Sequence, residues 1–388
     1  MQRPSSWVLA ARATAVSLLL FTLLPLAASG CAGVDAEDGC TDLSRRDPWT
    51  ADTESLAGTR LDDDGLARVL ILGLDGATGP AVEYLALDTD RAPTLRALMT
   101  RGRHASCGGA DDENCARAQR SPREDTSFLW VTASGWASVL TGVDGAHHCV
   151  KDNPPAALKP FASRARWFPT FFKRAHDLGW GTAAGGVATF VTALQGGQPR
   201  PGVLDYECGV DGDFSVVSVD ARSSCNLAQR AALVSDAPDR DRRLLEWMQL
   251  QVADPSLRVV MGVFDGIDAQ GHASGYDRNE GYLDAITEID TSLGSLLELV
   301  QERTASFSER WLVVVTADHG GHRVALWGNH DSVIGEDDAI PFILATYGNT
   351  PPLRALTRPV SQLDVHPTVM GWLERASPQV QGQVQGLQ

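Results

Sequence analysis

The sequence is short of positive charge. Its 33 Lys and Arg residues face 49 Asp and Glu residues, which gives a formal net charge of −16 at pH 7. Because such a surface repels polyanions, we do not expect binding to a nucleic-acid duplex. A small anionic substrate would need local positive charge, which bound metal ions can supply.

The chain also lacks internal repeats and a long unbroken apolar segment. No repeat of solenoid period is present, which argues against a repeat architecture. The apolar run from Ala13 to Ala28 is short and contains Pro25, so it does not predict a membrane span. It follows Arg3 and Arg12 and leads into small residues, as in a cleaved export signal. We therefore expect residues 1–31 to be a signal peptide.

The end of this segment resembles the lipobox of bacterial lipoproteins, in which cleavage precedes a cysteine that is then lipid-modified. It reads Leu-Ala-Ala-Ser-Gly-Cys and ends at Cys31. Ala28 stands where the pattern usually has Leu, so ordinary signal cleavage remains an alternative. The resemblance implies a periplasmic or cell-surface protein with a lipid anchor in the membrane, or a secreted one if Cys31 is not modified.

The cysteines have neither the Cys-x-x-Cys spacing of redox motifs nor that of zinc ribbons. The chain has seven, and lipidation of Cys31 would leave six, enough for complete pairing in an oxidising compartment. Six cysteines allow 15 pairings, and short spacings favour two of the bonds. The predicted disulfides are Cys107–Cys115 and Cys208–Cys225, with Cys40–Cys149 as the third.

The rest of the chain predicts a doubly wound α/β fold with a mainly parallel sheet. Apolar residues make up 43% of the sequence, enough for a large core. Short apolar runs, typical of strands buried on both faces, alternate with helical patterns. The predicted strands are 69–74, 259–264, 311–316 and 341–346. The predicted helices are 92–100, 167–178, 228–252, 279–302 and 361–373. In such a fold, functional groups gather beyond the carboxyl ends of the strands.

Composition divides the chain into four parts. Signal peptide 1–31 is followed by an acidic, Gly/Ser/Thr-rich tether over 32–65 and a catalytic domain over 66–376. The domain carries two polar inserted loops, 102–128 and 196–226, and a Gln-rich tail over 377–388 is expected to fray.

The stretch from Thr132 to Asn153 places hydroxyls at a predicted helix start. Ser134 can cap the helix, and Trp136 with the apolar residues after it follows helical spacing. A hydroxyl there feels the positive end of the helix dipole, which favours its ionised form and a bound anion.

Carboxylates and imidazoles follow three of the predicted strands. Asp75 follows the first strand, Asp268 and His272 lie just past the next, and Asp318-His319 follow the third. A further imidazole, His330, comes a short loop later. Such ligands at successive strand ends predict a two-metal site that suits zinc or manganese.

These elements resemble the alkaline phosphatase superfamily, and most closely its nucleotide pyrophosphatase/type I phosphodiesterase branch. The resemblance rests on five motifs that occur here in the family's order. They are a strand-end Asp (Asp75), Thr132 before a helix that ends in Thr141-Gly142, Asp268-x-x-Gly-His272, Asp318-His319-Gly, and His330 before Pro341-Phe342. Asn153 follows Thr132 by 21 positions (153 − 132), as the branch expects of its phosphate-binding Asn.

The resemblance implies an alkaline-phosphatase-like fold and two divalent metal ions, zinc or manganese. The first ion would be held by Asp75, Thr132, Asp318 and His319, and the second by Asp268, His272 and His330. It further implies a small phosphorylated substrate, with Thr132 as the nucleophile that becomes phosphorylated. Asn153 and the amide of Ala133 would then donate to a phosphoryl oxygen.

Some positions depart from the family pattern. Ser134 stands where the eukaryotic phosphodiesterases commonly have Pro, and Cys149 replaces the usual Gly after His148. His322 and His366 are weaker rivals for the last metal ligand, while His148 is expected to brace its loop. A sulfatase signature is absent, which disfavours sulfate esters.

Two alternatives stay open. A phosphomonoesterase or phosphonate hydrolase could use the same ligands, but its more highly charged substrate would call for an extra cation, for which Lys151 and Arg323 are the candidates. A catalytically silent envelope lipoprotein is disfavoured because no ligand position has been lost.

Overall fold

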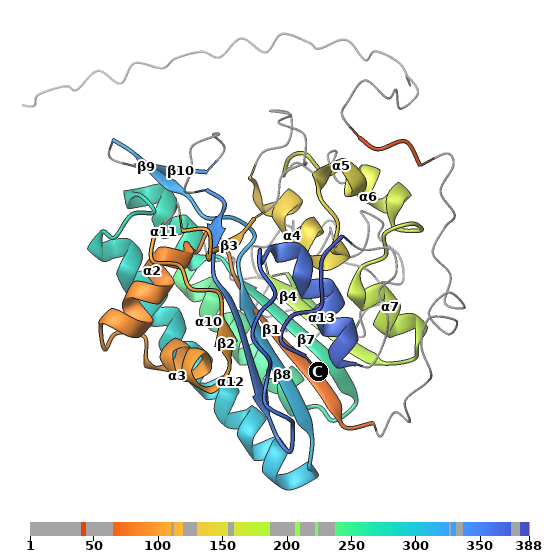
Figure 1. The fold of residues 1–388 in the computed structure, drawn as a ribbon. Coiled ribbons are helices and arrows are strands. Elements are labelled where there is room, and N and C mark those ends of the chain that lie inside the picture. The colour runs from red at the N-terminus through yellow and green to blue at the C-terminus, as the bar shows by residue number, and fades with distance from the viewer. Residues whose placement is uncertain are drawn as a thin grey trace, which may run out of the picture. The chain divides into compact units, whose positions relative to one another are not determined.

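The four predicted apolar runs form neighbouring strands at the centre of the main sheet (Figure 1). The computed structural model describes residues 40–43, 65–109, 112–118, 130–153, 159–186, 206–209, 222–223, 237–325, 327–330, 337–373 and 381–387. The predicted signal peptide with Cys31, and most of the tether, lie outside these residues. Within the described ranges, no helix is both long and apolar enough to cross a membrane.

Eight strands form the main sheet, in the order β2-β12-β8-β1-β7-β4-β5-β6. At its centre, β1 (Ala67–Leu74) pairs in parallel with β7 (Leu257–Phe264) and β8 (Arg310–Thr316). Every residue of β1 is buried, as expected for an apolar strand covered on both faces. The antiparallel pairs join β12 (Phe342–Tyr347) to its two neighbours. The remaining strands are β2 (Arg103–His104), β4 (Gly181–Gly186), β5 (Tyr206–Gly209) and β6 (Arg222–Ser223).

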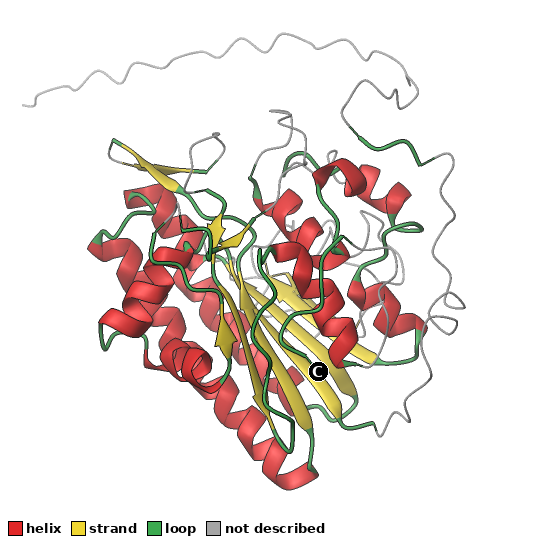
Figure 2. Ribbon diagram, in the orientation of Figure 1, coloured by secondary structure: helices red, strands yellow, loops and turns green. Residues whose placement is uncertain are grey.

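Helices cover both faces of the sheet, which confirms the predicted fold class (Figures 1 and 2). One face carries α3 (Pro93–Arg101), α10 (Ala237–Ala253) and α12 (Glu280–Phe307), and the other carries α4 (Thr132–Thr141), α7 (Phe171–Asp177) and α13 (Val365–Trp372). The smaller helices are α2 (Gly79–Glu83), π-helix η2 (Tyr84–Asp88), α5 (Gly145–His148), α6 (Lys159–Arg164), α11 (Gly266–Ser274) and 3-10 helix η5 (Gln362–Asp364). The smaller strands are β3 (Ala116–Arg117), β9 (His322–Val324), β10 (Trp327–Asn329) and β11 (Ala339–Ile340).

Four strands of the sheet, β2, β4, β5 and β6, fall outside the predicted runs, and β4, which pairs with β7, is the longest of them. β4 reads Gly-Thr-Ala-Ala-Gly-Gly and has one β-branched residue, Thr182, and no aromatic residue, so it lacks the enrichment that marks strands. Its small residues serve packing, because a Cβ on Gly185 would lie 2.7 Å from Leu244 and 2.8 Å from Trp247 of α10. The large side chains of the helix thus fill the space that the strand leaves empty.

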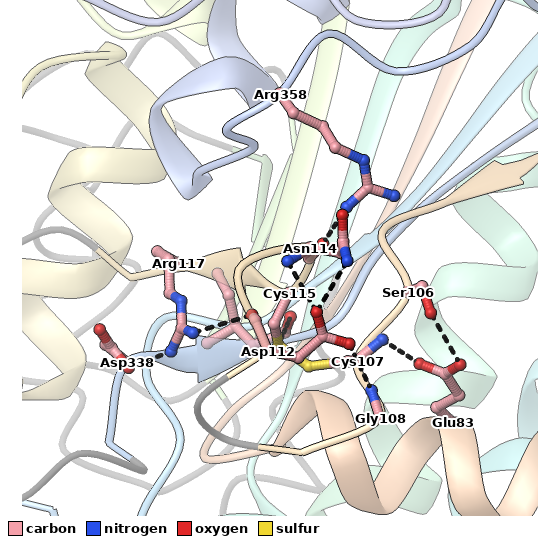
Figure 3. Close-up of a disulfide and its surroundings, with 11 residues drawn as sticks. Glu83, Ser106, Cys107, Gly108, Asp112, Asn114, Cys115, Arg117, Asp338 and Arg358 are labelled. Atoms are coloured by element: carbon pink, nitrogen blue, oxygen red, sulfur yellow. Dashed lines mark hydrogen bonds and ion pairs between the residues drawn. A yellow bond between two sulfur atoms is a disulfide. The ribbon is translucent and has the colours of Figure 1, made fainter.

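The first inserted loop is closed by the predicted Cys107–Cys115 disulfide (Figure 3). Glu83 of α2 accepts hydrogen bonds from the Cys107 amide and from Ser106 Oγ. On the other side, Arg117 pairs with Asp338 at 2.8 Å. The described part of the loop is therefore held against the domain, while residues 119–129 lie outside the description.

The predicted disulfide between Cys40 and Cys149 is also present, with Cα atoms 5.6 Å apart. Cys149 has φ 60°, a left-handed conformation that favours glycine. This conformation suits the Gly that the family pattern leads us to expect at this position, and the disulfide gives the cysteine a structural role here. The predicted Cys208–Cys225 pair lies outside the described side chains.

Within the tail expected to fray over 377–388, the described residues 381–387 are instead held by hydrogen bonds. Gln385 is buried, accepts from the Thr357 amide at 2.7 Å and donates to the Thr357 carbonyl at 2.9 Å. Gln381 Oε1 likewise accepts from the Asp144 amide at 2.7 Å. Because a glutamine amide both donates and accepts, a Gln-rich segment can satisfy buried backbone groups, which composition alone does not reveal.

Candidate active site

The predicted ligands meet at one edge of the sheet. Asp75 directly follows β1, Asp268 and His272 lie on α11 just after β7, and Asp318-His319 follow β8. Since these three strands are parallel neighbours, their carboxyl ends bring the side chains together. The β9–β10 hairpin then returns the chain so that His330 joins the same edge.

Asp75, Asp318 and His319 form one buried group whose ligand atoms lie within 4.8 Å of one another. His319 Nε2 is 3.6 Å from Asp75 Oδ1 and 3.4 Å from Asp318 Oδ2. The other Asp75 oxygen, Oδ2, accepts from the indole of Trp136 at 3.2 Å. These are the predicted protein ligands of the first ion, apart from Thr132.

A second group, Asp268, His319 and His330, satisfies the same 4.8 Å limit. His272 lies beside it, with Nε2 3.5 Å from Asp268 Oδ2 and 3.0 Å from His330 Nε2. The structure thus brings together the residues predicted for the second ion and adds His319, whose ring stacks on His330 at 3.9 Å between centroids. His319 lies between the two groups.

In each of the three imidazoles, Nδ1 contacts a backbone carbonyl and Nε2 faces the ligand groups. Nδ1 of His319 contacts the Gly320 carbonyl at 2.7 Å, and Nδ1 of His330 contacts the Trp130 carbonyl at 2.6 Å. His272 Nδ1 makes a longer contact of 3.3 Å with a carbonyl of β10. A carbonyl only accepts, so each Nδ1 carries the proton and each Nε2 presents a lone pair to the group. This tautomer is the one that metal-ligating histidines adopt.

The electrostatics of the edge favour a cation. Burial, and then the charges of Asp318 and Asp268, raise the pKa of Asp75 well above its ordinary value. Burial and the charge of Asp268 raise the pKa of Asp318 to about 8. Burial lowers the pKa of His319, and burial with the charge of His319 lowers that of His330 to about 4. The imidazoles therefore do not neutralise the carboxylates.

Two buried acceptor atoms at this edge lack a hydrogen-bond partner within the described parts of the chain, and a metal ion could take the place of that partner. Asp75 Oδ1 and His319 Nε2 have no hydrogen-bond partner among the described residues. Leaving such buried groups unsatisfied is costly, and both are acceptors that face each other. A divalent cation between them would satisfy both, so the donor set fits the metals that the sequence predicted.

The start of helix α4, which carries Thr132, packs against this edge. The Trp130 carbonyl contacts His330, and Gly135 packs so closely on Asp318 that a Cβ there would lie 2.5 Å from its carbonyl oxygen. Thr132 stands between these two contacts, at the first position of the helix, and is partly exposed. The predicted cap by Ser134 is wrong, because the helix begins two residues earlier and buries Ser134 in its first turn.

Asn153 lies beside the start of α4, although its contact differs from the prediction. Its Oδ1 accepts from the Ala133 amide at 2.9 Å, whereas both groups were expected to donate to a phosphoryl oxygen. The first amides of a helix have no partner within the helix, and Asn153 supplies one from outside. The Nδ2 group of Asn153 remains as the donor.

The rival histidines are engaged elsewhere. His148 Nε2 contacts Ser138 Oγ at 2.9 Å, which agrees with a bracing role. His322 Nδ1 pairs with Asp337 at 2.6 Å, and His366 Nε2 contacts Arg174 at 2.8 Å. None of the three belongs to the ligand groups formed by the described residues.

Of the two cations weighed for a phosphomonoesterase, Arg323 forms an ion pair with Asp277 at 3.1 Å. That pair partly neutralises its charge and holds the guanidinium against the loop after α11. Lys151 lies two residues before Asn153 and is partly exposed.

Tyr276 was not predicted as a site residue, but the structure places it against the second ligand group. Its hydroxyl donates to Asp268 Oδ1 at 2.6 Å. Burial and the Asp268 carboxylate raise its pKa far above the ordinary value, so it stays a donor. The available signal was its position four residues after His272, just past a glycine.

Comparison with known proteins agrees with this geometry. A family model for type I phosphodiesterase/nucleotide pyrophosphatase matches residues 69–359. A search of curated proteins finds no match. Human ectonucleotide pyrophosphatase/phosphodiesterase 5 is 13% identical, with 81% of this chain and 97% of that chain covered and a TM-score of 0.52. The murine protein, in an inactive form with AMP, is 12% identical, with 82% and 97% covered and a TM-score of 0.51.

A 2-O GAG sulfatase has a TM-score of 0.53 at 15% identity, with 80% of this chain and 71% of that chain covered. These likenesses show a shared alkaline-phosphatase-like fold. The family model extends from β1 past β12 and includes every predicted ligand and Thr132. The chain therefore belongs to the type I phosphodiesterase/nucleotide pyrophosphatase family of the alkaline phosphatase superfamily and is a phosphoric ester hydrolase.

Proposed function

We propose that the protein hydrolyses phosphodiester or pyrophosphate bonds with two divalent metal ions and a phosphothreonine intermediate. The observation that carries the proposal is that all three imidazoles present Nε2 toward the carboxylates of Asp75, Asp318 and Asp268. Asp75, Asp318 and His319 would hold one ion together with Thr132. Asp268, His272 and His330 would hold the other. The metal-dependent chemistry of the family and the donor set support zinc, with manganese as the alternative.

When bound, the ions would favour the ionised form of the nucleophile and offset the charge on the phosphoryl group. Thr132 Oγ1 attacks phosphorus, the P–O bond to the leaving group breaks, and the hydroxyl proton of Thr132 passes through solvent to the leaving oxygen. Water then attacks the phosphothreonine, the bond from phosphorus to Thr132 Oγ1 breaks, and the hydroxyl is regenerated. The net change is one diester and one water converted to one monoester and one alcohol.

Two groups of the chain would orient the phosphoryl group. The start of α4 places the positive end of the helix dipole beside the anion that Thr132 attacks. Asn153 Oδ1 is engaged by the Ala133 amide, which turns Nδ2 into the available donor. A fixed donor of this kind contributes most where charge develops in the transition state.

The test compares Thr132→Ala with Thr291→Ala, an exposed threonine of α12, on bis-p-nitrophenyl phosphate. We expect loss of turnover in the first variant and unchanged turnover in the second. Asp318→Ala should also abolish turnover while the chain still unfolds cooperatively. Full activity of both site variants would refute the proposal, as would turnover that survives complete metal removal.

The phosphomonoesterase alternative is less well supported, because Arg323 is paired with Asp277. Rates on p-nitrophenyl phosphate and on the diester, measured with one preparation, separate the two activities. A ratio in favour of the monoester would overturn the diester assignment.

We further propose that the protein is exported and held at a membrane through lipid on Cys31. The two disulfides support an oxidising compartment. Cys31→Ser should move the protein from the membrane fraction to the soluble fraction in its host. An unchanged distribution would contradict the lipid anchor.

A further inference from the structure

Tyr276 contacts all three residues proposed to hold the second ion, Asp268, His272 and His330. Its hydroxyl donates to Asp268 Oδ1 at 2.6 Å. Its ring meets His272 edge-on, with centroids 5.7 Å apart and planes at 76°. The ring of His330 lies 6.1 Å away at 87°. A single side chain therefore contacts the carboxylate and both imidazoles.

The ring of Tyr276 fits where it does because three glycines around it have no side chain. A Cβ on Gly271 or Gly321 would lie 2.4 Å from a ring carbon of Tyr276, and one on Gly328 would lie 2.5 Å away. These glycines come from α11, from the segment after β8 and from β10. Because three separate segments close on the ring, its position is tightly constrained.

The local backbone directs Tyr276 into this space. α11 ends at Gly275, whose φ of 99° is readily accessible to glycine and turns the chain back beneath the helix. A Cβ on Gly76 would lie 2.5 Å from Asp268 Oδ1. Oδ1 of Asp268 is thus enclosed between Gly76 and the Tyr276 hydroxyl, and Oδ2 is the oxygen that faces His272.

We propose that Tyr276 is a positioning residue for the second ion. It holds Asp268 so that one carboxylate oxygen is presented to the ion, and its ring supports His272 and His330. Groups that orient ligands in this way contribute strongly to metal affinity. The inference rests on the proposed function, since it requires that the site bind ions.

The experiment titrates the metal-free full chain with Zn²⁺ and follows heat, with thermal unfolding measured in parallel. Tyr276→Phe keeps the ring and removes the hydroxyl. We expect two binding steps in the wild type, and in the variant one step weakened by about 10- to 100-fold with the other unchanged. A role in stability alone would lower the unfolding temperature without acting on a single step.

Tyr282→Phe is the matched control, because Tyr282 is equally buried but bonds the backbone. Its hydroxyl accepts from the Thr78 amide at 2.9 Å and donates to the Gly76 carbonyl at 2.8 Å. This variant should be less stable yet keep the affinity of the step that Tyr276→Phe weakens.

Wild-type affinity for both ions in Tyr276→Phe would overturn the inference, and so would equal weakening of the same step in Tyr282→Phe. A wild-type chain that binds no Zn²⁺ would refute the proposed metal centre itself. The two failures are therefore distinguishable.

Discussion

Gly135 is the point at which the nucleophile helix packs on the metal-binding edge. A Cβ at this position would lie 2.5 Å from the Asp318 carbonyl oxygen and 2.6 Å from the Asp318 Cβ. Ordinary contacts begin at 3.4 Å, so Gly135→Ala requires a displacement of nearly 1 Å. The atoms that it meets are rigid, and α4 itself must move.

The energetic consequence can be compared with that of a helical glycine in open space. Replacing a helical Gly by Ala gains about 1 kcal/mol in propensity. Gly294→Ala in α12 should keep this gain, because its nearest new contact is Thr94 Oγ1 at 3.4 Å. At Gly135, overpacking costs about 1–3 kcal/mol. We therefore expect Gly135→Ala to be about 1–3 kcal/mol less stable than Gly294→Ala.

The activity should respond more strongly, because Thr132 begins the same helix one turn earlier. A misplacement of about 1 Å can cost about 100-fold in rate. Urea unfolding gives the two stabilities, and turnover of bis-p-nitrophenyl phosphate gives the two rates. Full activity in Gly135→Ala, with a stability equal to that of Gly294→Ala, would refute the close packing of α4 on Asp318.

Other measurements test the described packing and the metal centre. Replacing Cys40 and Cys149 by Ser should lower the free energy of unfolding by up to about 5 kcal/mol. Replacing Cys107 and Cys115 by Ser should lower it by up to about 3 kcal/mol, because that disulfide closes a shorter loop. The double variant Cys40→Ser/Cys149→Gly should be about 1 kcal/mol more stable than Cys40→Ser/Cys149→Ser, because the backbone at position 149 is left-handed. Burial lowers the pKa of His148 to about 3 in the folded chain, so protonation of the unfolded chain should remove about 2 kcal/mol of stability as pH falls from 6.5 to 5. His148→Asn should lose this part of the pH dependence in unfolding titrations. Zn²⁺ at a hundredfold excess over its dissociation constant should stabilise the metal-free chain by about 2.7 kcal/mol per site in thermal unfolding.

Local pattern was enough to find the main strands and the residues that follow them. An apolar run such as the one in β1 must be buried on both faces, and the first polar residue after it marks where the chain leaves the sheet. Asp75 and Asp318 were recognisable for this reason. β4 was not, because its small residues are explained only by the side chains of α10 that pack on them.

Motif spacing likewise predicted that Asn153 lies near Thr132, but it could not specify which group Asn153 contacts. Whether Asn153 bonds a substrate or the Ala133 amide depends on how the chain after α5 returns to α4. The same limit applies to Gln385, whose burial is decided by segments far away in the sequence.

The sequence by itself determined the four central strands of the sheet, the candidate ligands that follow them and the resemblance to the family. It did so because these features depend on short-range patterns of polarity and on motif spacing. Only the tertiary structure decided the orientation of the imidazoles, the contact of Gly135 with Asp318 and the place of Tyr276. Tyr276 lies against Gly271, Gly321 and Gly328. These glycines are far apart in the chain, and their shared role in making room for the Tyr276 ring follows only from the fold that brings them together.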